Sequence, residues 1–274
     1  MILINGQPEN RIPVSDRGLQ YGDGLFETLA FRNGELELLE QHIMRLQLGC
    51  KRFNLTFQQV DSLRAELAML CAQTAEDSVI KIILTRGSGG RGYKAPLENE
   101  AIRIISSHSM PEYPAANQSG VTVRLCEQRL GLNPTLAGIK HLNRLEQVLA
   151  RSEWDDRTIS EGLMLDINEN LIEGTMSNLF IVKNYQLITP ALTQAGIAGI
   201  MRGKVMEIAD SMSIACHEKT LTVNDLLDAD EVFLTNSIIK LWPVKTLLHN
   251  DTNKQWQHGV LTQQIQNVLE DLAH

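Results

Sequence analysis

The stretch that decides the fold is Gly138-Ile139-Lys140-His141-Leu142-Asn143-Arg144-Leu145-Glu146. From there on apolar residues recur at helical spacing, which predicts a helix with one buried face formed by Leu142, Leu145, Val148 and Leu149. Lys140 is expected at the entrance to that helix, where the helix dipole and partial desolvation disfavour the ammonium form. A lysine in the amine form is a nucleophile suited to Schiff-base chemistry; the alternative is an ordinary surface lysine.

Length and composition limit the classes of protein to consider. The chain has 274 residues, enough for two domains with separate cores. Its hydrophobic content of 43% and charged content of 21% are ordinary for a soluble globular protein, and no long apolar run predicts a membrane span. A net charge of -8 argues against nucleic acid or an anionic membrane as the main partner. The N-terminus lacks the pattern of a signal peptide, so a cytoplasmic location is the expectation.

The cysteines and histidines predict neither a disulfide framework nor a metal site. The four cysteines are far apart in the sequence, at positions 50, 71, 126 and 216. This spacing suits reduced, buried thiols. No histidine pair has the spacing around a glutamate that is typical of a helical zinc site.

Both halves of the chain mix strand and helix patterns without regular alternation, which predicts an α+β fold of two domains. Residues 1–110 form the expected N-terminal domain, with a hairpin of 2–4 and 11–14 around Asn5-Gly6 and irregular loop structure at 15–24. Residues 111–120 have linker composition. Residues 121–274 form the larger, cofactor-binding domain, with a helix expected at 200–212 and Thr222 as the N-cap of a short helix.

Three features outside the Lys140 stretch carry possible chemistry. Gly199 precedes a helix start and would let backbone N–H groups approach a phosphate, or it simply ends a loop. Arg45 shares a helix face with His42 and is either a bidentate phosphate donor or a solvated residue. Glu173 ends a short strand; if it is buried it needs a cationic partner, either a protonated cofactor ring nitrogen or an arginine.

Five motifs follow one another along nearly the whole chain: Tyr21-Gly22-Asp23-Gly24-Leu25-Phe26-Glu27-Thr28, His42-Ile43-Met44-Arg45-Leu46, Gly138 through Ala150, Glu173-Gly174-Thr175-Met176-Ser177-Asn178-Leu179-Phe180 and Gly199-Ile200-Met201-Arg202. In these motifs the sequence resembles the fold-type IV pyridoxal-phosphate enzymes, the group of branched-chain and D-amino-acid aminotransferases. The resemblance implies two mixed α/β domains, a homodimer, and pyridoxal 5'-phosphate (PLP) near the interface between the domains.

The same resemblance implies roles for individual residues. Lys140 would carry the cofactor as a Schiff base, Glu173 would pair with the pyridine nitrogen, and Arg45 would hold the phosphate. The backbone amides of Ile200 and Met201 would complete the phosphate cradle, with Asn178, Asn236 and Ser237 also at the cofactor. Which of Thr235, Asn236 and Ser237 contacts the phosphate stays open. Thr28 matches a candidate proton relay.

Two stretches, Gly138 to Gln147 and Arg86-Gly87-Ser88-Gly89-Gly90-Arg91-Gly92-Tyr93, favour a carbon-oxygen lyase within the group. The implied reaction converts 4-amino-4-deoxychorismate to 4-aminobenzoate and pyruvate, and transamination of branched-chain or D-amino acids is the alternative. Since that substrate carries two carboxylates, Arg91 is expected to bind one of them, with Tyr93 beside it.

Two rivals use the same sequence differently. A nucleotide-binding loop at 87–92 is disfavoured because no Gly-Lys-Ser/Thr ending follows and Pro96 stands where a phosphate-binding helix should begin. A catalytically silent cofactor-binding protein would show the chromophore without turnover.

Overall fold

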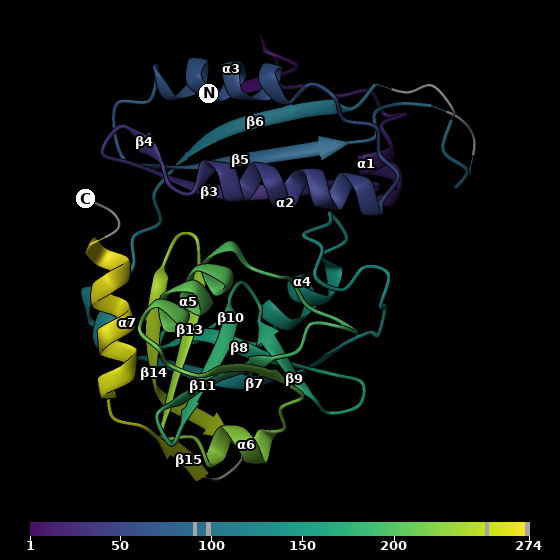
Figure 1. Cartoon of the computed structure of the whole chain (residues 1–274). Coiled ribbons are helices and arrows are strands. Elements are labelled where there is room, and N and C mark those ends of the chain that lie inside the picture. The colour runs from purple at the N-terminus through teal and green to yellow at the C-terminus, as the bar shows by residue number, and fades with distance from the viewer. Residues whose placement is uncertain (90–91, 97–99, 250–251, 272–274) are drawn as a thin grey trace. The chain divides into compact units, whose positions relative to one another are not determined.

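The computed structural model describes residues 1–89, 92–96, 100–249 and 252–271. The chain forms two compact units (Figure 1). The first comprises Met1–Pro111 together with Ile139–Asn143, and the second comprises Glu112–Gly138 together with Arg144–His274. The short segment around Lys140 therefore belongs with the N-terminal unit, although the sequence pattern assigned it to the C-terminal domain. The expected linker also contains a 3-10 helix, η1 (Ala115–Ser119), which packs against the second unit's sheet.

The first unit is an antiparallel sheet covered by helices. Its elements are β1 (Ile2–Ile4), β2 (Gln7–Pro8), α1 (Arg17–Tyr21), β3 (Gly24–Arg32), β4 (Glu35–Leu36), α2 (Leu39–Arg52), α3 (Val60–Cys71), β5 (Ser78–Thr85) and β6 (Ile102–Ser109). The strand order is β2-β1-β6-β5-β3-β4. Antiparallel strands alternate their side chains between the two faces, so one face can pack while the other stays available.

Side chains of β3 show this alternation directly. Leu25 and Leu29 belong to the core that α2 and α3 form with the sheet. Glu27 lies between them on that face, and its carboxylate contacts α2. Phe26 and Thr28 point to the opposite face.

Two expectations for the N-terminal region were wrong. The first hairpin pairs Ile2–Ile4 with Gln7–Pro8 rather than with residues 11–14. Asn5 and Gly6 both have positive φ, 48° and 80°, and make a two-residue turn, so the chain re-enters the sheet at once. Residues 15–24, expected to be irregular, contain α1, because the Asp16 carboxylate accepts a hydrogen bond from the Leu19 N–H and caps the helix.

The second unit is a nine-stranded mixed sheet with four α-helices, besides η1, among the described residues. Its elements are β7 (Val121–Leu130), α4 (Leu145–Arg151), β8 (Ile159–Asp166), β9 (Leu171–Gly174), β10 (Asn178–Lys183), β11 (Gln186–Pro190), α5 (Ile200–Ser211), β12 (Cys216–Lys219), α6 (Val223–Leu227), β13 (Glu231–Asn236), β14 (Lys240–His249), β15 (Thr252–Gln255) and α7 (Val260–Asp271). The order is β12-β11-β10-β13-β14-β7-β8-β9, with β15 on β14.

This sheet curls, because β9, at the end of the strand order, also contacts β10 and β11. One face of the sheet holds a core that includes Leu179, Leu234 and Trp242. Helix α5 packs against β13 and β12, and α7 packs against β13, β14 and α5 (Figure 1). The expected cap at Thr222 is confirmed: its hydroxyl accepts from the Asp225 N–H in a capping box that starts α6.

Helix α4 departs from the sequence expectation. It begins at Leu145, and its apolar residues are not buried: Leu145, Val148 and Leu149 are 69%, 60% and 48% exposed. Helical spacing correctly predicted that these side chains share one face, but it did not reveal whether this chain covers that face. The result is an exposed apolar stripe on α4.

Candidate active site

Lys140 lies in extended chain that continues the edge of β3. The Phe26 N–H donates to the Lys140 carbonyl at 3.0 Å, and the Leu142 N–H donates to the Gly24 carbonyl at 3.0 Å. The expectation that Lys140 stands at the entrance to a helix is therefore wrong, since α4 begins only at Leu145. Strand pairing, and not a helix start, therefore fixes the backbone at Lys140.

The half-buried Lys140 side chain lies against the sheet face that carries Phe26 and Thr28. Its Nζ is 4.3 Å from the centroid of the Phe26 ring. Lys81 pairs with Thr28 across the sheet, and its Nζ is 5.7 Å from the same centroid. A ring face attracts ammonium groups, so Phe26 provides a contact for the Lys140 side chain on this face. This face thus gathers the expected nucleophile, the expected proton relay and a second amine that sequence analysis did not single out.

Behind this face a buried ion cluster joins β3 to α2. The Glu27 carboxylate, 1% exposed, accepts from His42 Nδ1 at 2.6 Å and from Arg45 Nε at 2.8 Å and Nη2 at 2.5 Å. His42 and Arg45 do share a helix face, as their spacing predicts. Arg45 is mostly buried and paired rather than solvated, and Glu27 fixes the plane of its guanidinium.

Charge and burial act against each other in this cluster. Burial alone would raise the pKa of Glu27, but hydrogen bonds and charges from Arg45 and His42 lower it to about 2. Burial lowers the pKa of His42, with the charges of Arg45 and Lys140 acting in the same direction against Glu27. Glu27 is therefore ionised at neutral pH and its negative charge is compensated locally.

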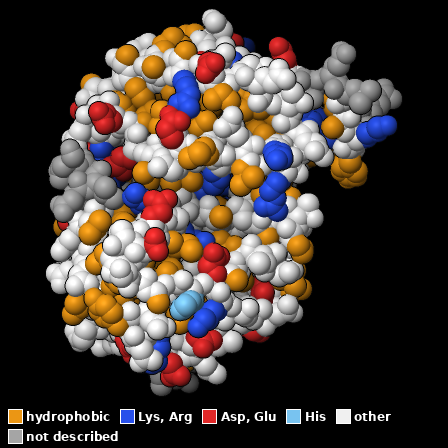
Figure 2. All heavy atoms as spheres, in the orientation of Figure 1, with side chains coloured by type: hydrophobic (Ala, Val, Ile, Leu, Met, Phe, Trp, Pro, Cys, Tyr) orange, Lys and Arg blue, Asp and Glu red, His pale blue; other side chains and the backbone are white. Residues whose placement is uncertain are grey.

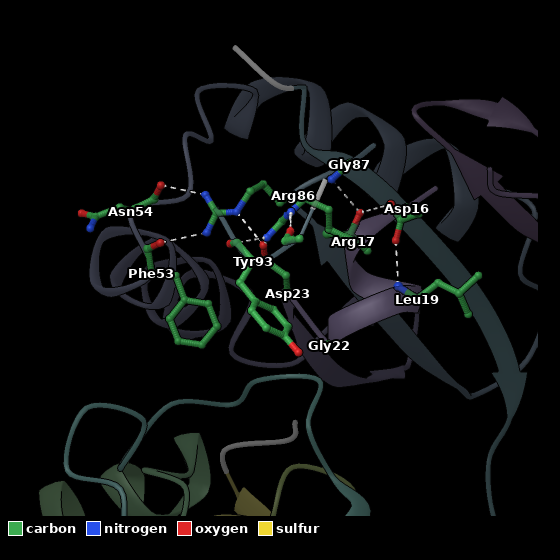
Figure 3. A network of polar contacts seen from close by, with 12 residues as sticks. Asp16, Arg17, Leu19, Gly22, Asp23, Phe53, Asn54, Arg86, Gly87 and Tyr93 are labelled. Atoms are coloured by element: carbon green, nitrogen blue, oxygen red, sulfur yellow. Dashed lines mark hydrogen bonds and ion pairs between the residues drawn. The ribbon is translucent and has the colours of Figure 1, made fainter. Parts of the chain in front are cut away.

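The arginine at the start of the glycine-rich loop is structural. Figure 3 shows the Arg86 guanidinium between Asp23 and the end of α2: Nε donates to Asp23 at 2.8 Å, and Nη1 and Nη2 donate to the carbonyls of Asn54 and Phe53. Burial raises the pKa of Asp23, yet Arg86 and Arg17 bring it below its usual value. Arg86 is committed to this network.

The far side of the same loop is held by Arg17. Its guanidinium donates to Asp23 and to the carbonyls of Gly92 and Tyr93, at 3.1 and 2.9 Å respectively for the two carbonyls (Figure 3). Tyr93 itself is 87% exposed, with its ring 5.5 Å from that of Tyr21. Arg91, the expected substrate ligand, lies outside the described residues.

In the second unit, Glu173 lies in β9 and is buried, as its position at the end of an apolar strand predicts. Its Oε2 accepts from the Ile197 N–H at 2.8 Å. Burial lowers the pKa of Arg144, while the charges of Glu173 and then Glu146 act in the opposite direction. An arginine, Arg144, therefore lies within electrostatic range of Glu173.

The start of α5 is built for a close approach of backbone groups. Asn178 bridges the segment before the helix: its Nδ2 donates to the Ile197 carbonyl at 2.8 Å, and its Oδ1 accepts from the Gly199 N–H at 3.1 Å. A Cβ on Gly199 would lie 2.0 Å from that Oδ1, so only glycine fits. Gly199 provides no side-chain cap, and no acceptor within the described residues meets the N–H groups of Ile200 and Met201. These groups are the helix-terminal donors that suit an anion.

Asn236 and Ser237 follow at the end of β13. Asn236 is occupied by the local chain: its Nδ2 donates to the Met176 carbonyl, and its Oδ1 accepts from the N–H groups of Ile238 and Ile239. Ser237 lies in the turn that this asparagine organises and has a contact of its own.

Sequence analysis missed Glu161, a wholly buried carboxylate that shapes the loop after Glu173. It accepts from the hydroxyls of Thr175 and Ser177 and from the N–H groups of Gly162, Thr175 and Met176. Burial raises the pKa of Glu161 despite these hydrogen bonds. The available signal is a charge in the middle of a strand whose following residues, Leu163 to Leu165, are apolar.

Comparison with known proteins places this geometry in a family. The sequence pattern of class IV amino-transferases matches residues 24–247. The chain belongs to the class IV aminotransferase family. That match contains four of the five motifs whole and the first motif from Gly24 on, so the family assignment made from them is confirmed.

Within the class IV family, lyases are among the most similar relatives. An aminodeoxychorismate lyase of Vibrio harveyi is 37% identical over 270 residues, covering 98% of this chain and 99% of the relative. The crystal structure of 4-amino-4-deoxychorismate lyase from Pseudomonas aeruginosa has a TM-score of 0.94 at 45% identity, covering 99% of this chain and 98% of that one. The Escherichia coli branched-chain amino acid aminotransferase has a TM-score of 0.88 at 25% identity, covering 99% and 93%. The predicted fold-type IV architecture is confirmed.

Other properties of the class IV chain concern its surface. Among the described residues, no helix is both long and apolar enough to cross a membrane. On the face drawn in Figure 2, basic and acidic side chains are interspersed with apolar ones. The net charge of -8 is therefore not gathered into one acidic area on that face.

Proposed function

We propose that this protein is a PLP-dependent lyase that converts 4-amino-4-deoxychorismate to 4-aminobenzoate and pyruvate, a step toward folate. The observation that carries the proposal is the Lys140 amine on the same sheet face as Thr28, in a chain that is 45% identical over nearly its whole length to a lyase of known structure. Aminotransferase relatives are more distant, at 29% and 25% identity.

The residues present fit PLP. The cofactor combines an aldehyde, a basic ring nitrogen and a phosphate, and when bound it supplies an electron sink for bonds next to a substrate amine. Lys140 offers an amine for the aldehyde. Glu173 offers a buried carboxylate for the ring nitrogen, and the start of α5 offers N–H groups for the phosphate that no acceptor among the described residues meets.

In the first unit, the proposal gives three residues distinct tasks. Lys140 would hold the cofactor through its amine, and the same amine would take the proton from the carbon beside the substrate nitrogen. Thr28, on the same sheet face, returns a proton to the departing three-carbon fragment. Arg45, with its plane fixed by Glu27, binds the phosphate.

In the second unit, the proposed tasks are to bind and orient the cofactor. The carboxylate of Glu173 would accept a hydrogen bond from the protonated ring nitrogen of the cofactor. The amides of Ile200 and Met201 bind the phosphate, and Asn178 holds the approach to α5 in place. Asn236 and Ser237 close the turn beside this helix start.

Substrate carboxylates need cations beyond those that bind the cofactor. We assign this task to Arg91 and to Lys81. The Lys81 amine lies on the sheet face of Lys140 and Thr28. Tyr93, whose carbonyl accepts from Arg17, belongs to the same loop as Arg91 and would lie beside the substrate.

We also propose that the protein is a homodimer. The apolar stripe of Leu145, Val148 and Leu149 on α4 is more exposed than a lone chain in water favours, and a second copy is the partner that the family relationship suggests.

The decisive experiment incubates the protein with enzymatically generated aminodeoxychorismate and measures 4-aminobenzoate and pyruvate. Equal amounts of the two products are expected. A parallel reaction with branched-chain or D-amino acids and 2-oxoglutarate tests the alternative: glutamate production without pyruvate release from aminodeoxychorismate would replace the lyase by an aminotransferase.

A further inference from the structure

Two buried arginines of the first unit share a single carboxylate oxygen. Nε of Arg17 and Nε of Arg86 both donate to Oδ2 of Asp23, each at 2.8 Å (Figure 3). The two arginine side chains are only 4% and 8% exposed. All three nitrogens of each guanidinium donate to the protein, because the other two nitrogens of each bind backbone carbonyls. This pair therefore holds chain segments together and does not present its charge to solvent.

The segments held by Arg17 belong to the loop that contains Tyr93. Its Nη1 and Nη2 donate to the carbonyls of Gly92 and Tyr93, at 3.1 and 2.9 Å. The Arg17 guanidinium also lies over the Tyr21 ring, 5.0 Å from its centroid, and the Tyr21 ring meets the Tyr93 ring edge-on at 5.5 Å. Because Tyr93 is 87% exposed, packing does little to hold it in place. Arg17 thus fixes both the backbone and, through Tyr21, the ring of Tyr93.

The carboxylate that Arg17 shares with Arg86 lies next to the docking site of the Lys140 segment. Asp23 is flanked by Gly22 and Gly24. The Gly22 carbonyl accepts from Asn143 Nδ2 at 3.1 Å, and the Gly24 carbonyl accepts from the Leu142 N–H at 3.0 Å. A Cβ on Gly22 would lie 2.4 Å from Asn143 Oδ1, so the two segments are in close contact. Asp23 therefore lies between the Lys140 segment and the loop of Tyr93.

From these contacts, and resting on the proposed function, we propose that Arg17 is a positioning residue for the substrate. It ties the Gly92–Tyr93 segment, in the loop to which we assign a substrate carboxylate, to the residue that supports the Lys140 segment. Without Arg17, the loop would have to be ordered each time substrate binds, which weakens binding. Asp23 would still be held by Arg86, so the Lys140 segment would stay in place.

This division of tasks predicts an effect on KM that is separate from any effect on kcat. Arg17→Gln should raise KM for aminodeoxychorismate about tenfold, the loss expected for charge-assisted hydrogen bonds. Its kcat and its dissociation constant for PLP should stay within about twofold of the wild type. Arg103→Gln is the matched control, because it removes another buried arginine of the same unit, one paired with Glu66. Both variants should lose stability, but the control should keep the wild-type KM.

Proteolysis of the cofactor-free proteins gives a readout that does not depend on turnover. Chymotrypsin cleaves after tyrosine, and its rate after Tyr93 under native conditions reports how often this segment opens. Cleavage there, identified by mass spectrometry, should be about tenfold faster in Arg17→Gln and unchanged in Arg103→Gln. Arg17→Lys keeps a charge beside Asp23, but one amine replaces the planar fork that reaches two carbonyls. This milder variant should show the same two changes, and it carries the test if Arg17→Gln does not fold.

A wild-type KM or a wild-type cleavage rate in both Arg17 variants overturns the inference. A fall in kcat or in PLP affinity as large as the rise in KM also overturns it, because Arg17 would then support the unit as a whole. A wild type that forms no 4-aminobenzoate from aminodeoxychorismate would instead reject the proposed function. The cleavage rates would in that case still decide whether Arg17 holds the loop.

Discussion

The buried carboxylate of Glu27 offers the sharpest test of the energetics of the first unit. Glu27→Gln keeps the shape of the side chain and removes its charge, leaving Arg45 and His42 on α2 without their shared anion. The pKa of Glu27 falls from an ordinary 4.5 to about 2. At about 1.4 kcal/mol per pKa unit, this fall stabilises the fold by about 3 kcal/mol at neutral pH. We therefore expect Glu27→Gln to lower the free energy of unfolding by about 3 kcal/mol at pH 7.

The pH dependence follows from the direction of the shift. A carboxylate whose pKa is depressed by folding contributes its full stability above the pKa of the unfolded chain, 4.5, and loses it as the pH falls toward the folded value of about 2. At about pH 3, roughly 2 kcal/mol of the contribution should be gone. The gap in stability between wild type and Glu27→Gln should therefore narrow below pH 4.5. The lowered pKa of His42 adds a loss of stability on acidification in the wild type, since only the unfolded chain then readily accepts the proton.

Urea unfolding of both proteins, followed by circular dichroism from about pH 3 to about pH 7, measures this difference in stability. That range spans the titration of a carboxylate. Glu66→Gln is the matched control, because it removes another buried carboxylate of the same unit, one paired with Arg103 on β6. Glu66→Gln should also lower the free energy of unfolding. The part of the pH dependence of that free energy that comes from Glu27 should remain in this control. A Glu27→Gln protein as stable as the wild type at neutral pH, or a gap that widens on acidification, would refute the reasoning.

Three further predictions concern the proposed reaction and assembly. Lys140→Ala should keep the fold and lose essentially all turnover, and borohydride reduction of the wild type with PLP followed by peptide mapping should label Lys140; a label on another lysine contradicts the assignment. Arg91→Ala should raise the Michaelis constant for aminodeoxychorismate about tenfold and leave the cofactor absorbance unchanged. Lys81→Met should have the same effect if both cations bind substrate carboxylates. A variant with wild-type kinetics would show that its residue does not bind the substrate. Leu145→Asp combined with Val148→Asp should convert a dimer to monomers in light scattering, because the stripe on α4 would no longer tolerate burial; an unchanged dimer would move the interface elsewhere.

The identity of the fold and of the family was readable from the sequence because the motifs are local and stand in a fixed order. Glycines at Gly22, Gly24 and Gly199 mark places where the backbone makes tight turns or close approaches, and such requirements act within a few residues. Helical spacing placed His42 and Arg45 on one face for the same reason. The capping box at Thr222 is likewise a contact between near neighbours in the chain.

The surroundings of those motifs were decided only by tertiary structure. Periodicity indicated that Leu145, Val148 and Leu149 share a face, but whether a face is covered depends on segments distant in sequence. Lys140 was expected before a helix; instead its backbone completes the edge of β3, more than a hundred residues earlier in the chain. The unpaired backbone groups of an edge strand can bind any extended segment, so local sequence cannot predict that the Lys140 segment pairs with β3.

Electrostatic partners show the same division. Along β3, Glu27 alternates with Phe26 and Thr28 and therefore points to the opposite face, a local property of any strand. Only the packed structure set α2 against that face, so that Arg45 and His42 meet one carboxylate, and only strand register placed Thr235 opposite Asn178. The direction of a side chain depends on a few neighbouring residues. A contact between two side chains from distant segments depends on the packing of the whole domain.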